Sequence, residues 1–428
     1  MTLQADFLEE LKYRGLVNDY SDPEELERLL VTEPVVLYCG FDPTADSLHI
    51  GHLLPMMTLQ RFQMAGHKPI ALAGGGTGLI GDPSGKTVER TLNPREVVES
   101  WVEKIKKQLS IFLDFNSKTN PAQLLNNYDW ISQLNVIEYL RDIGKHFSVN
   151  AMLAKDSVKS RLENRDVGIS YTEFSYMILQ SYDYYWLAQN HGCKLQIGGS
   201  DQWGNITTGI DLIRRTLQSP AYALTLPLIT TSEGKKFGKT EAGAVWLDAS
   251  KTSPYQFYQF WINITDQDVI KFIKYFTFLD RDTISQLESA VRDRPEKREA
   301  QQRLAHEVTT MIHGRSEADL ARLTAAALFK GELSSLTEGQ LKDALAGVPT
   351  TYLKEGRGGE MSLLDLVVET GLSPSRSRGR TDIESGAIYV NDIRETDQGR
   401  KLSDLARLHR KYIVLRKGKK NYHLVIIE

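Results

Sequence analysis

Cysteine and long apolar runs are what this sequence most clearly lacks. Its 428 residues include two cysteines, Cys39 and Cys193, which are too few for a disulfide framework or a cysteine-based zinc site. No apolar run reaches the roughly 18 residues that a membrane-spanning helix needs. Residues 1–14 are acidic and helix-like, without the basic and apolar segments of a secretory signal. We therefore expect a cytoplasmic protein that has no membrane partner.

A strong net charge is also absent, since the formal net charge is −3. The charge is uneven, however. Residues 373–428 carry 13 Lys and Arg against seven Asp and Glu, so this segment is +6 and the remainder is −9. A basic tail on an acidic body is typical of a protein whose last segment binds a polyanion. On charge alone, a solvated basic surface is the better explanation.

The composition is that of a globular protein, with 41% hydrophobic and 25% charged residues. At about 150 residues per domain, the length suggests about three domains. Short β-like runs alternate with helical patterns in the first half, which predicts an α/β domain with a parallel sheet. Helical periodicity follows, then a Gly- and Thr-rich linker, then the pattern of a small α+β module. The predicted parts are 1–247, 248–347, 348–360 and 361–428.

Hydrophobic periodicity predicts individual elements in the first and last parts. Strands are expected at 35–40, 69–73, 194–197 and 224–229, and helices at 48–64, 96–113, 136–144 and 171–189. In the last part we expect a helix that begins within 373–380 and ends near Gly386, a strand at 387–391, and a hairpin whose strands, 412–415 and 422–425, flank a cationic tip at 416–420.

Two glycine-rich runs match phosphate-binding motifs only superficially. Residues 76–81 fit G-x-G-x-x-G, but Pro83 disfavours the helix that this motif should open. No strand with an acidic end follows about 20 residues later, so a dinucleotide-dependent oxidoreductase is a poor fit. Residues 81–87 resemble a Walker A loop but are one residue short between the glycines. Because a phosphate nest depends on backbone N–H directions, we exclude a P-loop NTPase as well.

Two histidines, His49 and His52, lie between a predicted strand and a predicted helix. Their spacing puts both on one face of the first turn, where free N–H groups and the positive end of the helix dipole attract anions. Gly51 between them permits a close approach by a ligand. The pair can therefore donate hydrogen bonds to phosphate oxygens. For histidines considered alone a packing or capping role is more common, and a metal role is disfavoured because no third ligand stands nearby.

Two further patterns carry polar chemistry. Residues 231–240 form a glycine-hinged, lysine-rich run, which taken alone is an ordinary exposed turn. Tyr176, Gln180 and Asp183 have i, i+4, i+7 spacing and form one polar stripe on a predicted helix. Polar groups that are buried beside apolar neighbours need partners. A solvated helix face is an equally good explanation of this stripe alone.

Taken together, these motifs resemble those of the class I aminoacyl-tRNA synthetases. His49-Ile50-Gly51-His52 is similar to their HIGH motif, and Lys-Phe-Gly-Lys-Thr at 236–240 is similar to their KMSKS loop. The loop departs from that pattern at Phe237, Gly238 and Thr240 but keeps both lysines and a final hydroxyl. Over its whole length the chain more specifically resembles the bacterial tyrosyl-tRNA synthetase family, in the runs 38–44, 78–86 and 196–205.

The resemblance implies a tyrosine pocket in a Rossmann-like catalytic domain. In the family, the residues that match Tyr38 and Asp183 bind the phenol oxygen of tyrosine. Those that match Asp82, Tyr176 and Gln180 hold its ammonium group, and the one that matches Gln202 orients its carboxylate. A pocket that reads a hydroxyl rejects the analogue without it, because its polar groups would be left unpaired.

The resemblance also implies a nucleotide site, to which residues are assigned by position only. For ATP or the adenylate they are Cys39, Gly40, Asp42, Gly51, Gly199, Asp201 and Lys239. For catalysis at the phosphates they are Thr44, His49, His52, Lys86, Arg90, Lys236, Lys239 and Thr240. Small-residue packing at Cys39 and helix capping at Asp201 are the structural alternatives.

The implied reaction has two steps. The tyrosine carboxylate attacks the α-phosphate of ATP to give tyrosyl-adenylate and pyrophosphate, and a terminal ribose hydroxyl of tRNA(Tyr) then accepts the tyrosyl group. ATP is a substrate, accompanied by Mg²⁺, and no cofactor is tightly bound. The family further implies a homodimer, an anticodon-side helical domain and a small RNA-binding module shared with a ribosomal protein. Its expected tRNA contacts are Arg376, Arg378, Arg380, Arg416, Lys417, Lys419 and Lys420.

Three alternatives stay open. A tryptophan-specific relative would share the fold and the motifs, but Tyr38, Asp183 and the basic tail favour tyrosine. A catalytically inactive RNA-binding paralogue is disfavoured because both motifs keep their cations. A small-molecule adenylating enzyme of the same superfamily should lack the basic tail.

Overall fold

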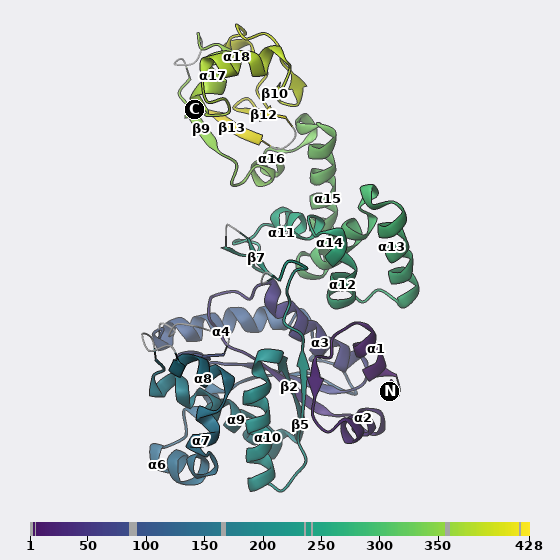
Figure 1. Ribbon diagram of the computed structural model, residues 1–428, viewed down its shortest axis with the longest axis vertical. Coiled ribbons are helices and arrows are strands. Elements are labelled where there is room, and N and C mark those ends of the chain that lie inside the picture. The colour runs from purple at the N-terminus through teal and green to yellow at the C-terminus, as the bar shows by residue number, and fades with distance from the viewer. Residues whose placement is uncertain are drawn as a thin grey trace. The chain divides into compact units, whose positions relative to one another are not determined.

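The computed structural model describes residues 3–4, 6–84, 92–163, 168–234, 237–240, 243–355, 360–418 and 421–428. It divides into two compact units (Figure 1). The first unit comprises residues 1–252 and 264–304, and the second comprises residues 253–263 and 305–428. None of the helices in these ranges is both long and apolar enough to cross a membrane.

A six-stranded sheet in the order β1-β6-β5-β2-β3-β4 forms the centre of the first unit. Strand β1 runs antiparallel to β6, and all other neighbouring pairs are parallel. The predicted α/β class with a parallel sheet is therefore confirmed. The strands are β1 (Asp19–Tyr20), β2 (Val36–Phe41), β3 (Lys68–Ala73), β4 (Gln123–Asn126), β5 (Cys193–Gly199) and β6 (Tyr222–Leu226), with β7 (Lys239–Thr240) and β8 (Gly243–Ala244) as a separate pair.

Helices surround this sheet. Tyr38 of β2 and Ile70 of β3 share a buried cluster with Tyr184 and Leu187 of α9 and with Ile213 of α10, so these two helices cover one face. The helices of this unit are α1 (Phe7–Tyr13), α2 (Pro23–Thr32), α3 (Leu53–Met64), α4 (Arg95–Leu109), α5 (Tyr128–Ile131), α6 (Val136–Glu138), α7 (Val149–Leu153), α8 (Asp156–Glu163), α9 (Tyr171–His191), α10 (Trp203–Thr216), α12 (Asp266–Phe276) and α13 (Arg281–Asp293).

The chain order of the strands creates a switch point between β2 and β5. From β2 the chain moves outward through β3 to β4 on one side, and through β5 to β6 on the other. In open α/β sheets, ligands bind in the crevice beyond the carboxyl ends of the strands at such a point. The ends of β2, at Phe41, and of β5, at Gly199, therefore mark where a site is expected.

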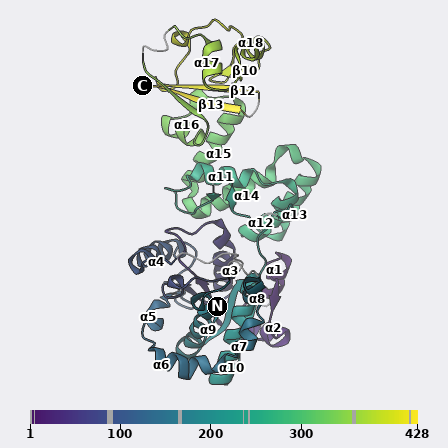
Figure 2. The same cartoon turned by 60° about the vertical axis from the view of Figure 1, so that its left-hand side comes forward.

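The second unit holds a five-stranded sheet in the order β11-β10-β12-β13-β9. Figures 1 and 2 show this sheet between helices α17 and α18 on one side and α16 on the other. Its strands are β9 (Thr350–Leu353), β10 (Ile388–Val390), β11 (Ile393–Arg394), β12 (Tyr412–Lys417) and β13 (Asn421–Ile427). Its helices are α11 (Pro254–Ile262), the end of α14 (Glu299–His313), α15 (Arg315–Lys330), α16 (Glu338–Ala344), α17 (Leu363–Glu369) and α18 (Arg376–Glu384).

Three predicted segments differ in detail. The helix expected at 48–64 begins with a 3₁₀ turn, Ile50–His52, before α3 starts at Leu53. The helix expected at 136–144 is broken into α6, a π-helical turn at Tyr139–Ile143 and a 3₁₀ turn at Gly144–His146. The segment 348–360, predicted as a linker, contains β9, which pairs in parallel with β13.

Candidate active site

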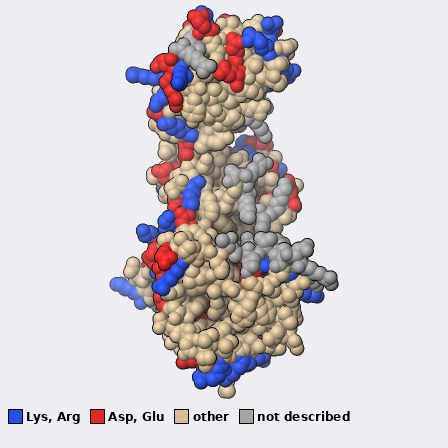
Figure 3. Space-filling model, turned by 90° about the vertical axis from the view of Figure 1, so that its left-hand side faces the viewer, with Lys and Arg blue, Asp and Glu red and all other residues tan. Residues whose placement is uncertain are grey.

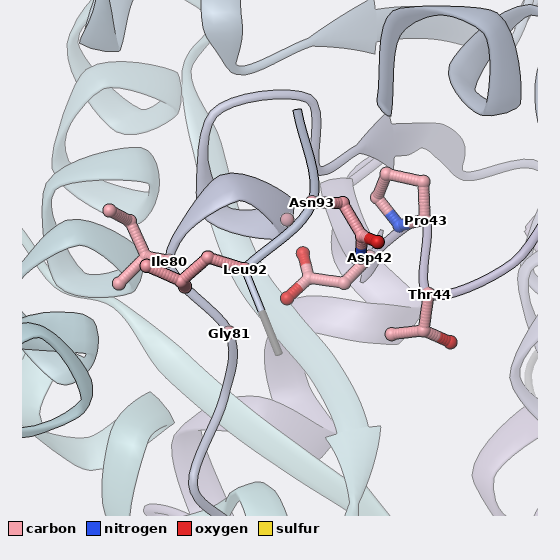
Figure 4. Close-up of a pocket in the computed structure, with 8 residues that line it drawn as sticks. Asp42, Pro43, Thr44, Ile80, Gly81, Leu92 and Asn93 are labelled. Atoms are coloured by element: carbon pink, nitrogen blue, oxygen red, sulfur yellow. The ribbon is translucent and has the colours of Figure 1, made fainter. Parts of the chain in front are cut away.

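A cavity of about 230 Å³ lies beyond the carboxyl ends of β2 and β3. Asp42, Pro43 and Thr44, directly after β2, form one wall, and residues that follow β3 form the other. Figure 4 shows Asp42 projecting between Thr44 on one side and Ile80 and Leu92 on the other. Thr44 and Asp42, both assigned to the nucleotide site, therefore line this cavity.

Asp42, directly after the carboxyl end of β2, is hydrogen-bonded to Tyr176 of helix α9. The hydroxyl groups of Thr77 and Tyr176 donate to its two carboxylate oxygens at 2.6 and 2.7 Å. Burial and the nearby Asp42 carboxylate raise the pKa of Tyr176 well above its usual value, so its proton stays on the phenol. A Cβ at Gly74 would overlap the Asp42 carboxylate. Only glycine therefore allows β3 to end so close to this residue.

Asp183 forms the buried floor of the site. Its oxygens accept hydrogen bonds from Trp130 Nε1 and Asn127 Nδ2, both at 2.8 Å. Burial raises the pKa of the Asp183 carboxyl to about 8, against the opposing effect of these two donors. Asn127 also donates to Thr77 Oγ1 at 2.9 Å. The floor is thus linked through Thr77 to Asp42.

Two buried polar atoms beside this floor have no hydrogen-bond partner within the described residues. They are the Tyr38 hydroxyl and the Gln196 Oε1 atom, on residues that are 1% and 3% exposed. Tyr38 and Gln196 are direct neighbours on β2 and β5, so both side chains lie on the same face of the sheet. Because buried polar groups are rarely left unpaired, this pair suits a ligand that brings its own polar atom.

Asn205 ties together the polar side chains on the opposite side of the site. Its amide donates to Gln180 Oε1 at 3.0 Å and to Gln202 Oε1 at 3.3 Å. Gln202 in turn donates to Asp82 Oδ2 at 2.8 Å, and the other Asp82 oxygen accepts from the Ser84 N–H. The structure thus joins Asp82, Gln180 and Gln202, which the sequence analysis assigned to one substrate, into one network.

The two histidines cap the turn that leads into α3. His49 Nδ1 accepts from the Gly51 N–H at 3.0 Å, and His52 Nδ1 accepts from the His49 N–H at 3.2 Å. Their rings lie 4.1 Å apart. Burial, aided by His49, lowers the pKa of His52 to about 3, so His52 is neutral at physiological pH. With Nδ1 of each ring acting as an acceptor, each Nε2 carries the proton and is a donor.

The lysine-rich segment packs directly beside this histidine turn. Val245 N donates to Gly238 O at 3.2 Å, and Ile50 N donates to Val245 O at 3.0 Å. Gly238 has φ +92°, and a Cβ there would lie 3.0 Å from Ile50 Cγ1, so glycine is required at this contact. The sequence predictions for Lys86, Arg90 and Lys236, and for the side chains of Lys239 and Thr240, lie outside the described residues.

The other residues predicted for the nucleotide site differ in how far they are buried. Cys39 is buried, its thiol donates to Gly40 O at 3.8 Å, and burial raises the pKa of the thiol to about 12. Gly40 is exposed, with open space where a side chain would be. Gly199, at the end of β5, lies close to the Asp201 carboxylate. Gly40 and Gly199 thus leave the backbone accessible at the carboxyl ends of β2 and β5.

The basic residues predicted to bind tRNA fall into two groups. On α18, Arg376 and Arg378 are exposed, and they pair with Asp365 and Asp382. Arg380 Nε donates to Gln398 Oε1 at 3.0 Å. Arg416 instead stacks over Tyr389, and Lys417 is paired with the buried Asp382 carboxylate at 2.5 Å. Lys419 and Lys420 lie outside the described residues.

Figure 3 shows both charge signs on the surface of the C-terminal segment. Acidic side chains therefore lie among the basic ones of residues 373–428, and Asp365, outside this segment, pairs with Arg376. The two α18 arginines keep most of their surface free despite their ion pairs, with 65% and 59% of their side chains exposed. The side chains of Arg416 and Lys417 are mostly buried, with 17% and 21% of their surface exposed. They therefore mainly stabilise the fold of the module.

Five residues of the site were not identified from the sequence. They come from segments that carry no recognisable motif or from motif positions that were given no role. Asn205 lay within a run that matched the family pattern, and Gln196 alternates with apolar residues on a predicted strand, which was the available signal. The five are Thr77, Asn127, Trp130, Gln196 and Asn205.

Comparison with known proteins gives consistent matches along the chain. Residues 30–330 match the family model of class I tRNA synthetases of the W and Y type, and residues 340–425 match that of the tyrosine–tRNA ligase SYY-like C-terminal domain.

Individual relatives agree with these models. A tyrosine–tRNA ligase from Bacillus pumilus is 57% identical over 423 residues, covering 98% of this chain and 99% of the relative. One from Geobacillus stearothermophilus is 55% identical over 421 residues, covering 98% and 99%. A crystal structure of a C-terminally truncated mitochondrial tyrosyl-tRNA synthetase from Aspergillus nidulans superposes with a TM-score of 0.69 at 33% identity, covering 76% of this chain and 94% of that one.

Proposed function

The chain belongs to the class I tRNA synthetases of the tryptophan and tyrosine group, and from that premise we propose that it ligates tyrosine to tRNA. Its whole-length similarity to tyrosine–tRNA ligases supports this function. The observation that carries the choice of tyrosine is the buried pair of Tyr38 and Asp183 at the bottom of the site, with an unpartnered hydroxyl and a carboxylate. The reaction proceeds in two steps, activation by ATP and transfer to tRNA.

The amino acid lies with its ring above the sheet and its phenol at Tyr38 and Asp183. Asn127 and Trp130 already donate to the Asp183 oxygens, so the carboxyl group is held in place to hydrogen-bond with the phenol hydroxyl. The Tyr38 hydroxyl then donates to the same phenol oxygen. At the other end, Asp82, Tyr176 and Gln180 receive the ammonium group, and Gln202 orients the carboxylate.

The nucleotide occupies the crevice beyond β2 and β5, next to the histidine turn. Asp42, Thr44, Gly40 and Gly199 border the nucleoside, with Cys39 beneath and Asp201 beside it. His49 and His52 donate from Nε2 to phosphate oxygens at the start of the turn. Lys86, Arg90, Lys236, Lys239 and Thr240 stabilise the charge that develops on the leaving pyrophosphate. The attacking group is the substrate carboxylate, so catalysis rests on positioning and charge stabilisation.

Magnesium accompanies ATP in this proposal, and no resident metal is assigned to the protein. The small C-terminal sheet, with the exposed arginines of α18, binds the tRNA backbone, and the helical part preceding it lies on the anticodon side. Arg376, Arg378 and Arg380 supply phosphate contacts there. Lys419 and Lys420 join them from the hairpin tip.

We further propose that the enzyme acts in the cytoplasm as a homodimer. Support comes from a group of large apolar side chains that are exposed between β4 and the start of α9 in the first unit. Exposed apolar side chains concentrated in one segment mark an interaction surface. Sedimentation velocity tests this state directly. The residues are Val136, Ile137, Leu140, Val149, Leu153, Leu162 and Tyr171.

The test of function is ATP–pyrophosphate exchange measured with each of the standard amino acids, followed by charging of tRNA(Tyr). Tyrosine alone should support exchange. Exchange driven by tryptophan would show the sister specificity. The absence of exchange with every amino acid would show an inactive RNA-binding paralogue. Exchange without tRNA charging would show a small-molecule adenylating enzyme.

A further inference from the structure

Helix α12 holds the lysine-rich loop through a buried carboxylate. Asp268, in the first turn of α12, is 3% exposed. Its two oxygens accept the Ser232 N–H at 3.0 and 3.1 Å, and Oδ2 also accepts the Ser232 hydroxyl at 3.1 Å. Ser232 lies just before the glycine hinge of the loop. The carboxylate thus hydrogen-bonds to the backbone of the loop and to the side chain of Ser232.

Lys271, in the next turn of α12, adds two further contacts, one to Asp268 and one to the backbone just before the loop. Its Nζ lies 3.1 Å from Asp268 Oδ1 and donates to the Thr230 carbonyl at 2.8 Å. Burial works to raise the pKa of Asp268, but the hydrogen bond from Ser232 and the pairing with Lys271 outweigh it and hold the pKa below its usual value. The carboxylate is therefore ionised at neutral pH, which strengthens its hydrogen bonds.

The same helix also holds the other described side of the loop. Phe237 is buried against Phe272 and Phe276, with ring centroids 4.3 and 5.9 Å away. Ser232 and Phe237 lie on either side of Lys235 and Lys236 in the sequence. One rigid element therefore sets both anchor points of the segment that carries these cations.

The far end of α12 is fixed to the helix that follows the histidine turn. Arg61, in the last turn of α3, donates to the carbonyl groups of Tyr275 and Thr277 at 3.2 and 2.7 Å. Arg14 of the N-terminal segment shares the Thr277 carbonyl at 3.1 Å. The histidine turn thus precedes α3, and the lysine-rich loop is held by α12. These two helices are joined by the hydrogen bonds of Arg61.

We propose that Asp268 is a positioning residue for the activation step, acting through Ser232 on the lysine-rich loop. This inference rests on the proposed function, because it concerns the rate of that reaction. Asp268 contacts none of the residues assigned to tyrosine. Its loss therefore slows the formation of the adenylate and leaves the binding of the amino acid unchanged. A purely structural carboxylate would lower stability without this separation.

The test compares Asp268→Asn with the wild-type enzyme in single-turnover formation of tyrosyl-adenylate, well below the unfolding temperature. We expect the rate to fall about tenfold, which corresponds to the loss of about one strong hydrogen bond in the transition state. The dissociation constant for tyrosine should stay within about twofold. A wild-type rate in Asp268→Asn overturns the proposal, as does a rise in the dissociation constant that accounts for the whole effect.

Two further variants separate positioning from stability. Asp280→Ala removes the N-terminal side-chain cap of α13, where Asp280 accepts the Thr283 N–H at 2.7 Å, and should lower the melting temperature without slowing activation. An equal slowing in Asp280→Ala would overturn the proposal. Ser232→Ala, at an exposed position, should slow activation less than Asp268→Asn, with effects in the double variant that are less than additive. Full additivity would contradict the shared contact.

The failure of the proposed function would be recognised separately. A wild-type enzyme that forms no tyrosyl-adenylate refutes the proposed function and, with it, the role of Asp268. An active wild-type enzyme whose rate survives both Asp268→Asn and Ser232→Ala refutes only the positioning role. If Asp268→Asn does not fold, the rate of Ser232→Ala decides: a lowered rate supports the role and an unchanged rate overturns it.

Discussion

Tyr38 and Tyr184 show how two similar residues serve different ends. Their rings lie 5.4 Å apart in one cluster, and both side chains are buried. The Tyr184 hydroxyl lies 2.8 Å from the carbonyl oxygens of Lys194 and Tyr222, so its proton has an acceptor, whereas the Tyr38 hydroxyl has no partner in the described part of the chain. An unpaired buried hydroxyl costs stability. Its presence at the floor of the site is explained by a substrate that pairs with it.

Replacing each of these tyrosines by phenylalanine should separate the two roles. Tyr38→Phe should weaken tyrosine binding by about 1 kcal/mol, which is about fivefold, because one hydrogen bond to the phenol is lost. The melting temperature should stay the same or rise. Tyr184→Phe should instead lower the unfolding free energy by about 1–3 kcal/mol and leave tyrosine binding intact. Fluorescence titration and thermal melts measure both, and the reverse assignment would contradict the account.

His52 should make the free energy of unfolding fall as the pH is lowered. Its pKa in the folded protein is about 3, against 6.5 for the unperturbed side chain. Between these values the unfolded chain binds a proton that the folded protein does not, so stability falls as the pH drops from about 6.5 toward 3. The slope from one such group is at most about 1.4 kcal/mol per pH unit.

The variant His52→Gln should therefore flatten the melting temperature as a function of pH below about 6.5. His67, buried elsewhere in the first unit with its pKa lowered to about 4 by burial, contributes in the same direction and remains in the variant. A His67→Gln control should flatten the curve without affecting activation by ATP. An unchanged slope in His52→Gln would show that His52 is protonated or exposed in the folded enzyme.

Among the elements, the short strands β1 and β4 were not predicted, whereas β2, β3, β5 and β6 of the first sheet and helix α9 were predicted within a few residues. Their patterns are local, since apolar runs and an amphipathic stripe are visible without knowledge of their partners. The break at Ile50–His52 was missed because it depends on the extended backbone of His49, with φ −123° and ψ 172°. Strand β9 was missed because its partner, β13, lies some 70 residues further along the chain.

The candidate site was predicted unevenly for the same reason. Residues that belong to recognisable motifs, such as His49 and Asp82, were identified from spacing and resemblance. Asn127, Trp130 and Thr77 matter because they meet Asp183 and Asp42 across the fold, and no local pattern signals such meetings. The confirmed prediction of a tyrosine–tRNA ligase rested on the motif residues, the Tyr38 and Asp183 pair and the basic tail.

For the lysine-rich loop, the prediction concerns the second lysine of the motif. Lys239→Ala should slow adenylate formation by about 100-fold, as expected for the loss of a cation aimed at developing charge. Tyrosine binding should be near normal, because none of the residues assigned to the tyrosine pocket lies on the loop. Pre-steady-state kinetics with a parallel binding titration measure both quantities. Equal losses in rate and affinity would show that the loop shapes the tyrosine pocket instead.

At the scale of the whole molecule, the C-terminal sheet shares its core with the helices before it. Tyr412 and Val414 on one face of β12 pack with Leu336 and Leu341. Ile413 and Leu415 on the other face pack with α17 and α18. This alternation follows the two-residue period of a strand. The segment that contains α16 therefore packs with the last module, although the sequence analysis placed it in the helical part 248–347.

This packing determines where the chain can be shortened. A fragment that ends at Gly331, after α15, should keep tyrosine-dependent exchange, while kcat/KM for tRNA charging should fall by about 100-fold or more, equivalent to about 2.8 kcal/mol. A fragment that ends at residue 359 keeps α16 but loses β12 and β13. It should be less soluble, because Leu336 and Leu341 lose their cover. Undiminished charging by the shorter fragment would remove the last module from tRNA binding.

The most direct test of the central claim is a crystal structure of the enzyme soaked with L-tyrosine. We expect the phenol oxygen within about 3 Å of both the Tyr38 hydroxyl and an Asp183 carboxylate oxygen, the range of a hydrogen bond, and the ammonium group near Asp82 and Gln180. Tyrosine bound elsewhere, or with its phenol directed away from Tyr38 and Asp183, would contradict the account.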